Sequence, residues 1–152
     1  IQELRYRTIR HAGPNPAGPA LPALNLRVDW DGDGEADSYL VYEPYQDLGN
    51  AAIKDNEWQE WDALRNGQAK WWISPGGTKD DPIDCPQAKP CTWTQLIAKA
   101  KSVYSTDPTI AEGRDFVGSL GINQGSGNPE LDAAVDWLTV RVGGVHERYE
   151  FG

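Results

Sequence analysis

Short segments in which apolar and polar residues alternate recur along most of this chain, and they restrict it to a mainly β fold. Alternation with period two, enriched in β-branched and aromatic residues and bounded by Gly, Pro, Asn or Asp, is typical of strands. Such segments cover residues 3–10, 24–29, 38–43, 114–122 and 134–151. We therefore predict an all-β fold, an antiparallel β-sandwich.

The sequence also predicts two tight turns and one short helix. Asn66-Gly67 predicts a hairpin turn between the aromatic-rich arms 57–65 and 68–74, and Gly143-Gly144 predicts the tip of a final hairpin. The segment TWTQLIAKAKSVY (92–104) predicts one short helix, because Thr92 and Gln95 have the spacing of a capping box.

Length and charge bound the possible functions. A chain of 152 residues suits one domain, 1–152, with its own core. Its 23 acidic and 14 basic side chains give a formal charge of −9, which repels a phosphate backbone and argues against nucleic acid as a partner. No apolar run approaches the roughly 18 residues that a membrane span needs, so we expect no membrane insertion.

The segment DWDGDGEAD (29–37) carries the strongest site pattern. Asp29, Asp31, Asp33, Gly34 and Asp37 fall on positions 1, 3, 5, 6 and 9 of the EF-hand loop pattern, and the carbonyl of Glu35 falls on position 7. Carboxylates at alternate positions around a sharp turn can converge on one hard cation. The alternative is a solvated acidic turn, but the spacing favours a Ca²⁺ site.

The loop departs from the EF-hand in two respects. Leu40 stands at position 12, where the EF-hand has a bidentate Glu, and strands rather than helices flank the loop. We therefore expect a calcium-binding β-loop-β hairpin, with Glu43 or water completing the ligand shell. Its role would be structural, since a sensor needs a helix pair that can open.

The two cysteines suggest an extracellular location. Cys85 and Cys91 bound the segment CPQAKPC, which has no metal-ligand pattern, so we predict a disulfide between them; a pair of reduced thiols is the alternative. The chain starts at Ile1 and has no methionine, which leads us to expect a mature chain without its signal peptide, secreted or at the cell surface.

Several segments also carry a resemblance to a family: LRYRTIR, LNLRVDWDGDGEADSYLVYEPY, WQEWDA, AKWWIS, FVGSLGINQGSGNPELDAAVDWLTV and YEF. Together they resemble a β-sandwich domain of unassigned function that is common in secreted proteins of bacteria, notably actinobacteria. Residues Asp136 to Val140 are also similar to the last strands of concanavalin-like or jelly-roll modules. The resemblance implies a jelly-roll-like β-sandwich fold and a secreted location, and it implies no enzymatic reaction.

The sequence offers little for catalysis. His11 lies in a proline-rich connector and His146 on the polar side of a strand, so both are predicted to be solvated, and no nucleophile elbow, phosphate loop or zinc motif occurs. The acidic residues could supply a carboxylate pair, but none stands out. We therefore expect no enzymatic activity.

The tryptophans raise a second possibility, because there are seven of them. Strand alternation in AKWWIS predicts Trp71 in the core and Trp72 on the opposite face, and Trp137 is also expected to be buried. Exposed aromatic rings can stack on sugars. The candidate sugar-binding residues are Trp61, Trp72, Tyr42 and Tyr45.

Two functions follow from these patterns. The first is a non-enzymatic extracellular structural or assembly domain, a surface or filament-type subunit that associates with copies of itself or with neighbouring surface proteins. The alternative is a carbohydrate-binding module that presents exposed tryptophans to a glycan. For assembly, residues 2–10 are predicted to form an edge strand, either integral to the domain or exchanged between subunits.

Overall fold

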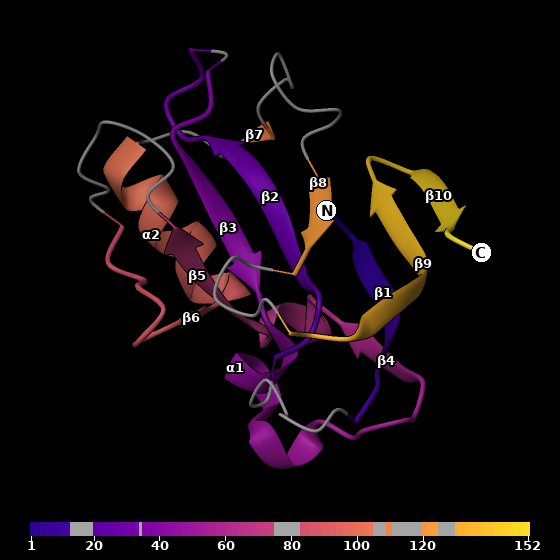
Figure 1. Ribbon diagram of the computed structural model, residues 1–152. Helices are drawn as coiled ribbons and strands as arrows, with labels where there is room; N and C mark the ends of the chain where they lie inside the picture. The colour runs from indigo at the N-terminus through magenta and orange to yellow at the C-terminus, as the bar shows by residue number, and fades with distance from the viewer. Residues whose placement is uncertain (13–19, 34, 75–82, 105–108, 111–119, 125–129) are drawn as a thin grey trace. The chain divides into compact units, whose positions relative to one another are not determined.

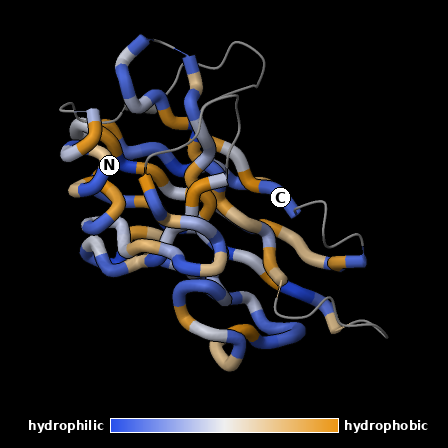
Figure 2. The backbone as a smooth tube through the Cα atoms, turned by 90° about the vertical axis from the view of Figure 1, so that its left-hand side faces the viewer, coloured by the Kyte–Doolittle hydropathy of each residue, from blue (hydrophilic) through white to orange (hydrophobic). Residues whose placement is uncertain are grey.

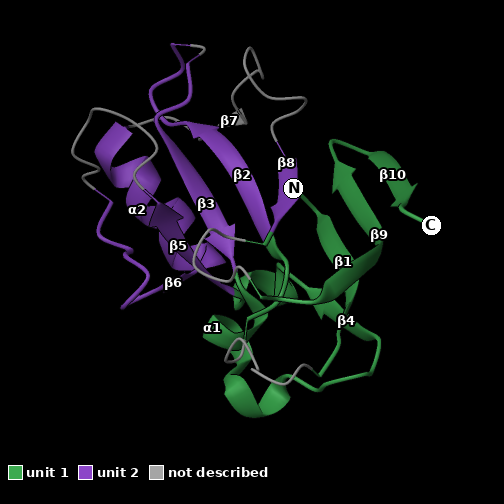
Figure 3. Ribbon diagram, viewed as in Figure 1, with its two compact units in different colours: residues 1–23, 43–69, 124–152 green, residues 24–42, 70–123 purple. Residues whose placement is uncertain are grey.

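The computed structural model describes residues 1–12, 20–33, 35–74, 83–104, 109–110, 120–124 and 130–152. The chain divides into two compact units, each assembled from segments that are far apart in the sequence. The first unit comprises residues 1–23, 43–69 and 124–152, and the second comprises 24–42 and 70–123 (Figure 3). The prediction of one domain stays a prediction.

The first unit contains a four-stranded antiparallel sheet. Its strands are β1 (Glu3–Arg10), β4 (Gln59–Asp62), β9 (Ala133–Val142) and β10 (Val145–Glu150), and their order is β10-β9-β1-β4 (Figure 1). The predicted edge position of the first strand is wrong, because β1 pairs with β4 on one side and β9 on the other. Its N-terminal segment is therefore an integral strand.

Burial alternates strictly along β1. Leu4, Tyr6 and Thr8 are buried, and the partly exposed Arg5 and Arg7 alternate with them. Figure 2 shows hydrophilic and hydrophobic residues interspersed along the backbone. Two polar groups in this core are satisfied: the Tyr6 hydroxyl donates to the carbonyl of Pro22 (2.9 Å), and the Trp61 indole donates to the Thr8 hydroxyl (2.8 Å).

The second unit contains most of a six-stranded sheet. Its strands are β2 (Ala23–Asp29), β3 (Ser38–Tyr42), β5 (Lys70–Ser74), β6 (Cys91–Thr92), β7 (Thr109–Ile110) and β8 (Leu120–Asn123). The order is β6-β5-β3-β2-β7, with β8 also paired to β2. Strands β2 and β3 form the predicted hairpin around the acidic loop, in register from Leu24↔Tyr42 to Val28↔Ser38.

An aromatic cluster forms the centre of the second unit. Trp71 is fully buried, and its ring centroid lies 5.4 Å from those of both Tyr42 and Trp93. The helix α2 (Trp93–Tyr104) begins with the predicted capping box, in which the Gln95 amide donates to the Thr92 hydroxyl and the Thr92 amide to the Gln95 side chain. The predicted helix and the core position of Trp71 are confirmed.

The remaining helical segments are short and belong to the first unit. They are α1 (Pro44–Leu48) and the 3₁₀ turns η1 (Asn50–Ala52) and η2 (Arg65–Gly67). The buried carboxylate of Asp47 in α1 pairs with Arg65 (3.1 Å), which ties α1 to η2.

The predicted hairpin around Asn66-Gly67 is wrong. The turn itself forms, with Asn66 in the left-handed region (φ 52°), but its two arms join different sheets. The reason lies in the tryptophan of each arm: Trp61 in β4 bonds to Thr8 of β1, and Trp71 in β5 packs on Tyr42 of β3. A turn sequence predicts a local change of chain direction, and it does not predict which distant residues these side chains contact.

The final hairpin is confirmed. Val142 pairs with Val145 around Gly143 and Gly144, which both have positive φ (56° and 89°) as such a two-residue turn requires. The strand predicted over 114–122 is present as β8 from Leu120 onward, and its first part lies outside the described residues. A mainly antiparallel β fold with one longer helix is thus confirmed, whereas the jelly-roll order stays a prediction.

Candidate metal centre

Three aspartates of the acidic loop come together at the end of the β2–β3 hairpin. Carboxylate oxygens of Asp29, Asp31 and Asp37, one from each, all lie within 4.8 Å of one another. Oxygens on opposite sides of a calcium ion are separated by roughly 4.8 Å, twice a Ca–O distance of about 2.4 Å. The spacing therefore fits three oxygens around one such ion.

The three carboxylates differ in exposure. Asp29 is 3% exposed, Asp37 is partly exposed and Asp31 is exposed, so the group extends from the buried end of β2 to the surface. Burying a carboxylate beside two others raises the free energy unless positive charge balances it. A cation that enters from the exposed side would supply that charge.

Local hydrogen bonds shape the loop. The amide of Gly32 donates to the Asp29 carboxylate (2.6 Å), and the amide of Asp33 donates to Asp31 (3.2 Å). Gly32 has a φ of 81°, a left-handed conformation that glycine adopts without a side-chain clash. A carboxylate can accept about four hydrogen bonds or metal contacts, so these bonds leave room for a metal.

Trp30 anchors the loop, a role that the sequence analysis did not assign. Its backbone amide donates to the Asp37 carboxylate (2.8 Å), and its indole donates to the hydroxyl of Ser38 (2.6 Å). The ring is 1% exposed and stacks on Tyr104 of α2, with centroids 6.3 Å apart. Its place directly after β2, between the first two acidic positions, is the sequence signal that could have identified it.

Not every predicted ligand joins the group. Asp33 is exposed and is not one of the three residues whose carboxylate oxygens converge. Its carboxylate accepts the amide of Glu35 (2.8 Å). The Glu35 carbonyl stays a predicted ligand. The acidic loop ends where β3 begins, at Ser38, whereas Glu43 follows the other end of this five-residue strand. The Glu43 carboxylate accepts a hydrogen bond from the Tyr45 hydroxyl there. Glu43 as the completing ligand was therefore a wrong prediction.

The predicted disulfide between Cys85 and Cys91 is present, with Cα atoms 5.4 Å apart. It joins the loop before β6 to the sheet, because Cys91 pairs with Trp71 of β5 and the Cys85 carbonyl accepts the amide of Ile73 (2.8 Å). The Lys99 ammonium of α2 donates to the carbonyl of Asp84 in the same loop (2.6 Å). The disulfide thus fastens a loop that contacts both the sheet and the helix.

Two of the four candidate sugar-binding residues are wrong. Trp61 is 3% exposed and Tyr42 is fully buried, so neither ring offers a face to a sugar. Both rings are occupied by the core contacts described above. Trp72 and Tyr45 are partly exposed and stay predictions. Trp137 is buried, as expected.

Searches of protein-family models, curated proteins and solved structures found no match to this chain. The resemblance to secreted bacterial sandwich domains therefore stays a prediction. Among the helices that the structure describes, none has both the length and the apolar character needed to span a bilayer.

Proposed function

We propose that this chain is a non-enzymatic extracellular structural domain, stabilised by calcium and a disulfide, that associates with copies of itself or with neighbouring surface proteins. The observation that carries the proposal is the convergence of Asp29, Asp31 and Asp37, one of them buried, at the end of a paired hairpin. A cation there would stabilise the hairpin by neutralising charge that otherwise opposes its closure.

Calcium is the cation that this chemistry favours. Its ligands are oxygens, it tolerates irregular coordination, and extracellular modules bind it with Kd values of about 10⁻⁴ to 10⁻³ M. The Cys85–Cys91 disulfide supports the same location, because disulfides persist in oxidising compartments.

A structural role fits the hairpin better than a sensor role. Strands β2 and β3 remain paired up to Val28↔Ser38, directly below the loop, and the amide of Asp37 donates to the Val28 carbonyl (2.9 Å). A sensor exposes a new surface when its flanking elements separate. Here the flanking elements are hydrogen-bonded to each other, so an ion would stiffen them.

Sedimentation velocity and thermal melting, both with saturating calcium and with a chelator, test this proposal. We expect self-association both in calcium and in chelator, and a lower melting temperature after chelation. Asp37→Asn should reproduce the effect of the chelator. Asp33→Asn is the matched control, since Asp33 lies in the same loop but outside the group of three.

Each alternative gives a different outcome. A chain that is monomeric at every concentration and binds sugars on a glycan array would replace the proposal with the carbohydrate-binding function. A chain that associates but melts identically in calcium and chelator would remove calcium from the proposal.

A further inference from the structure

Strand β10 is unusually exposed for a strand that carries large apolar side chains. All six of its residues, Val145–Glu150, are exposed. Four of the seven exposed large hydrophobic residues in the described part of the chain lie in this strand or directly beside it: Val142 (42%), Val145 (60%), Tyr149 (51%) and Phe151 (54%). A concentration of this kind on one hairpin marks an interaction surface.

The exposed side chains continue a buried row of the sheet. Strand register places Trp61, Tyr6, Leu138 and Tyr149 side by side across β4, β1, β9 and β10. The first three are 3%, 0% and 6% exposed, whereas Tyr149 is 51% exposed. The apolar row of the sheet therefore ends at an uncovered tyrosine.

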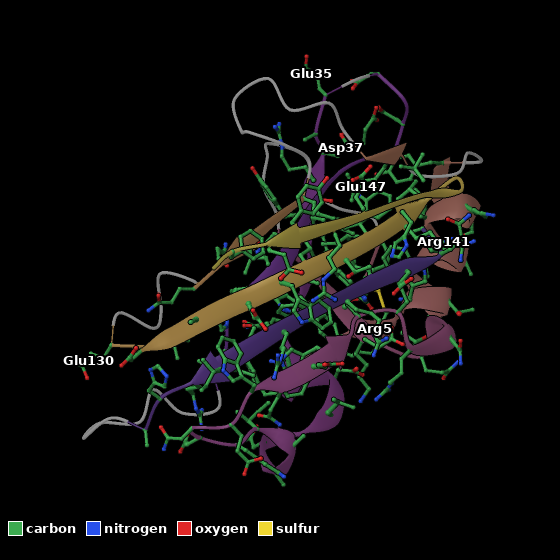
Figure 4. All side chains as sticks on the ribbon, turned by 90° about the vertical axis from the view of Figure 1, so that its right-hand side faces the viewer. Arg5, Glu35, Asp37, Glu130, Arg141 and Glu147 are labelled. Atoms are coloured by element: carbon green, nitrogen blue, oxygen red, sulfur yellow. A yellow bond between two sulfur atoms is a disulfide. The ribbon has the colours of Figure 1, made fainter. Side chains whose placement is uncertain are left out.

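The free edge of β10 also presents backbone groups. β10 is the outermost strand of its sheet, beside β9 (Figures 1 and 4). Because a two-residue turn makes Val142 and Val145 a hydrogen-bonded pair, the odd-numbered residues that follow also bond to β9. The Phe151 amide follows this pattern and donates to the Asp136 carbonyl (2.8 Å). His146, Arg148 and Glu150 accordingly turn their N–H and C=O groups toward the open edge.

We propose that β10 pairs antiparallel with β10 of a second copy of this chain, with Tyr149 opposite Tyr149 on the two-fold axis and Arg148 opposite Glu150. This interface deepens the assembly role proposed above and rests on it. The two four-stranded sheets would then join edge to edge into one sheet of eight strands, and the apolar row would run unbroken through both copies.

Charge selects this register over its neighbours. Directly opposite residues in an antiparallel ladder have their side chains on the same face of the sheet. The two-fold axis between two β10 strands must therefore pass through a residue, and the possible registers differ in which residue that is. The registers centred on Arg148 and on Glu150, one residue to either side, and the register centred on Glu147 each set two copies of that charged residue opposite each other. Like charges in directly opposite positions destabilise a sheet.

The proposed register instead forms a square of alternating charge. Arg148 and Glu150 already pair within one chain at 2.5 Å, on the face opposite Tyr149. In the pair of copies, each Arg148 would also face Glu150 of the other copy, and each Glu150 would face Arg148. Every charge in the square then has opposite charges as its neighbours.

Single-cysteine crosslinking tests the register. Both native cysteines are in the disulfide, so an added cysteine is the one free thiol. Opposite residues in a non-hydrogen-bonded pair have Cα atoms about 4.5 Å apart, close enough for a disulfide. We expect Tyr149→Cys to give a covalent dimer on mild oxidation. Val145→Cys, an equally exposed position on the same face, should not, because its opposite position lies beyond the paired segment.

Charge reversal tests the pairing without a crosslink. Arg148→Glu and Glu150→Arg should each lose at least tenfold in self-association affinity, because each puts like charges opposite each other. An equal mixture of the two variants should associate again, since every cross-strand pair is then Arg with Glu. Melting temperatures within a few degrees of the wild type would show that the variants are folded.

The outcomes separate this interface from the assembly role itself. Dimers that form in the wild type but neither crosslink through Tyr149→Cys nor respond to charge reversal would overturn the β10 interface and leave assembly through another surface. A wild-type chain that never associates would overturn both. Association of the mixture but of neither single variant is the result that supports the register.

Discussion

Two hairpins of this chain differ in which part is exposed to solvent. The β2–β3 hairpin has a long acidic loop, yet its base is buried through Trp30 and Asp29. The β9–β10 hairpin has a tight two-glycine turn, yet its outer strand is exposed along its full length. The first hairpin brings three carboxylates together, and the second exposes apolar side chains and an outer strand edge.

The two proposals above give each hairpin a different binding partner. Converging carboxylates are balanced by a cation, and an exposed strand edge with apolar side chains is balanced by another strand. The proposed ion would act on the stability of the single chain, whereas the proposed strand partner would act on assembly. Perturbing the two hairpins should therefore affect different measurements.

The largest expected effect comes from Trp30→Ala. Removing this buried ring takes away the stack on Tyr104 and the bond to Ser38, so we expect a loss of about 3 to 5 kcal/mol in unfolding free energy. Chemical denaturation measures it. Calcium should also stabilise this variant less than the wild type, because the backbone amide that donates to Asp37 is no longer held in place by a buried ring. An unaltered calcium response would show that Trp30 does not anchor the loop.

A smaller loss is expected when Cys85 and Cys91 are both replaced by Ala. The disulfide closes a small ring, for which chain entropy gives about 2 kcal/mol of stabilisation. Denaturation of the oxidised wild type and the double variant measures it, and reduction of the wild type is the control. Self-association should persist in the folded variant, because the disulfide and β10 belong to different units.

The smallest effect on stability is expected for Tyr149→Ser. An exposed side chain outside the core changes unfolding free energy by about 0.5 kcal/mol or less when the chain is dilute and monomeric. The same variant should associate measurably less in sedimentation. A destabilisation as large as that of Trp30→Ala would mean that β10 belongs to the core, and the contrast between the hairpins would fail.

Much of the fold could be predicted from local pattern. Alternation located β1, β2 and β3, the capping pair Thr92 and Gln95 located α2, and Gly143-Gly144 located the last turn. These signals are local, since each depends on residues within a few positions. The disulfide was predictable because only two cysteines exist.

Long-range pairing could not be predicted in the same way. The strong turn at Asn66-Gly67 suggested a hairpin. The strands on either side of it join different sheets, because Trp61 bonds to Thr8 and Trp71 packs on Tyr42, both far away in the sequence. The same limit explains the wrong edge position of β1, whose second neighbour, β9, comes more than a hundred residues later.

The candidate site shows the same division. The spacing of aspartates predicted Asp29, Asp31 and Asp37, whose carboxylates converge, and it also predicted Asp33, which is not in the converging group. For the sugar-binding candidates, side-chain type alone did not reveal burial, and Trp61 and Tyr42 proved to be core residues.

Calorimetric titration of calcium into the chelator-treated, oxidised chain, paired with its thermal melt, tests the central claim most directly. We expect one site per chain and a stabilisation of about 2 to 4 kcal/mol at a hundred- to thousandfold excess over Kd. Asp33→Asn should keep both, while Asp37→Asn should weaken both. No binding heat together with an unchanged melting temperature would contradict a calcium-stabilised domain.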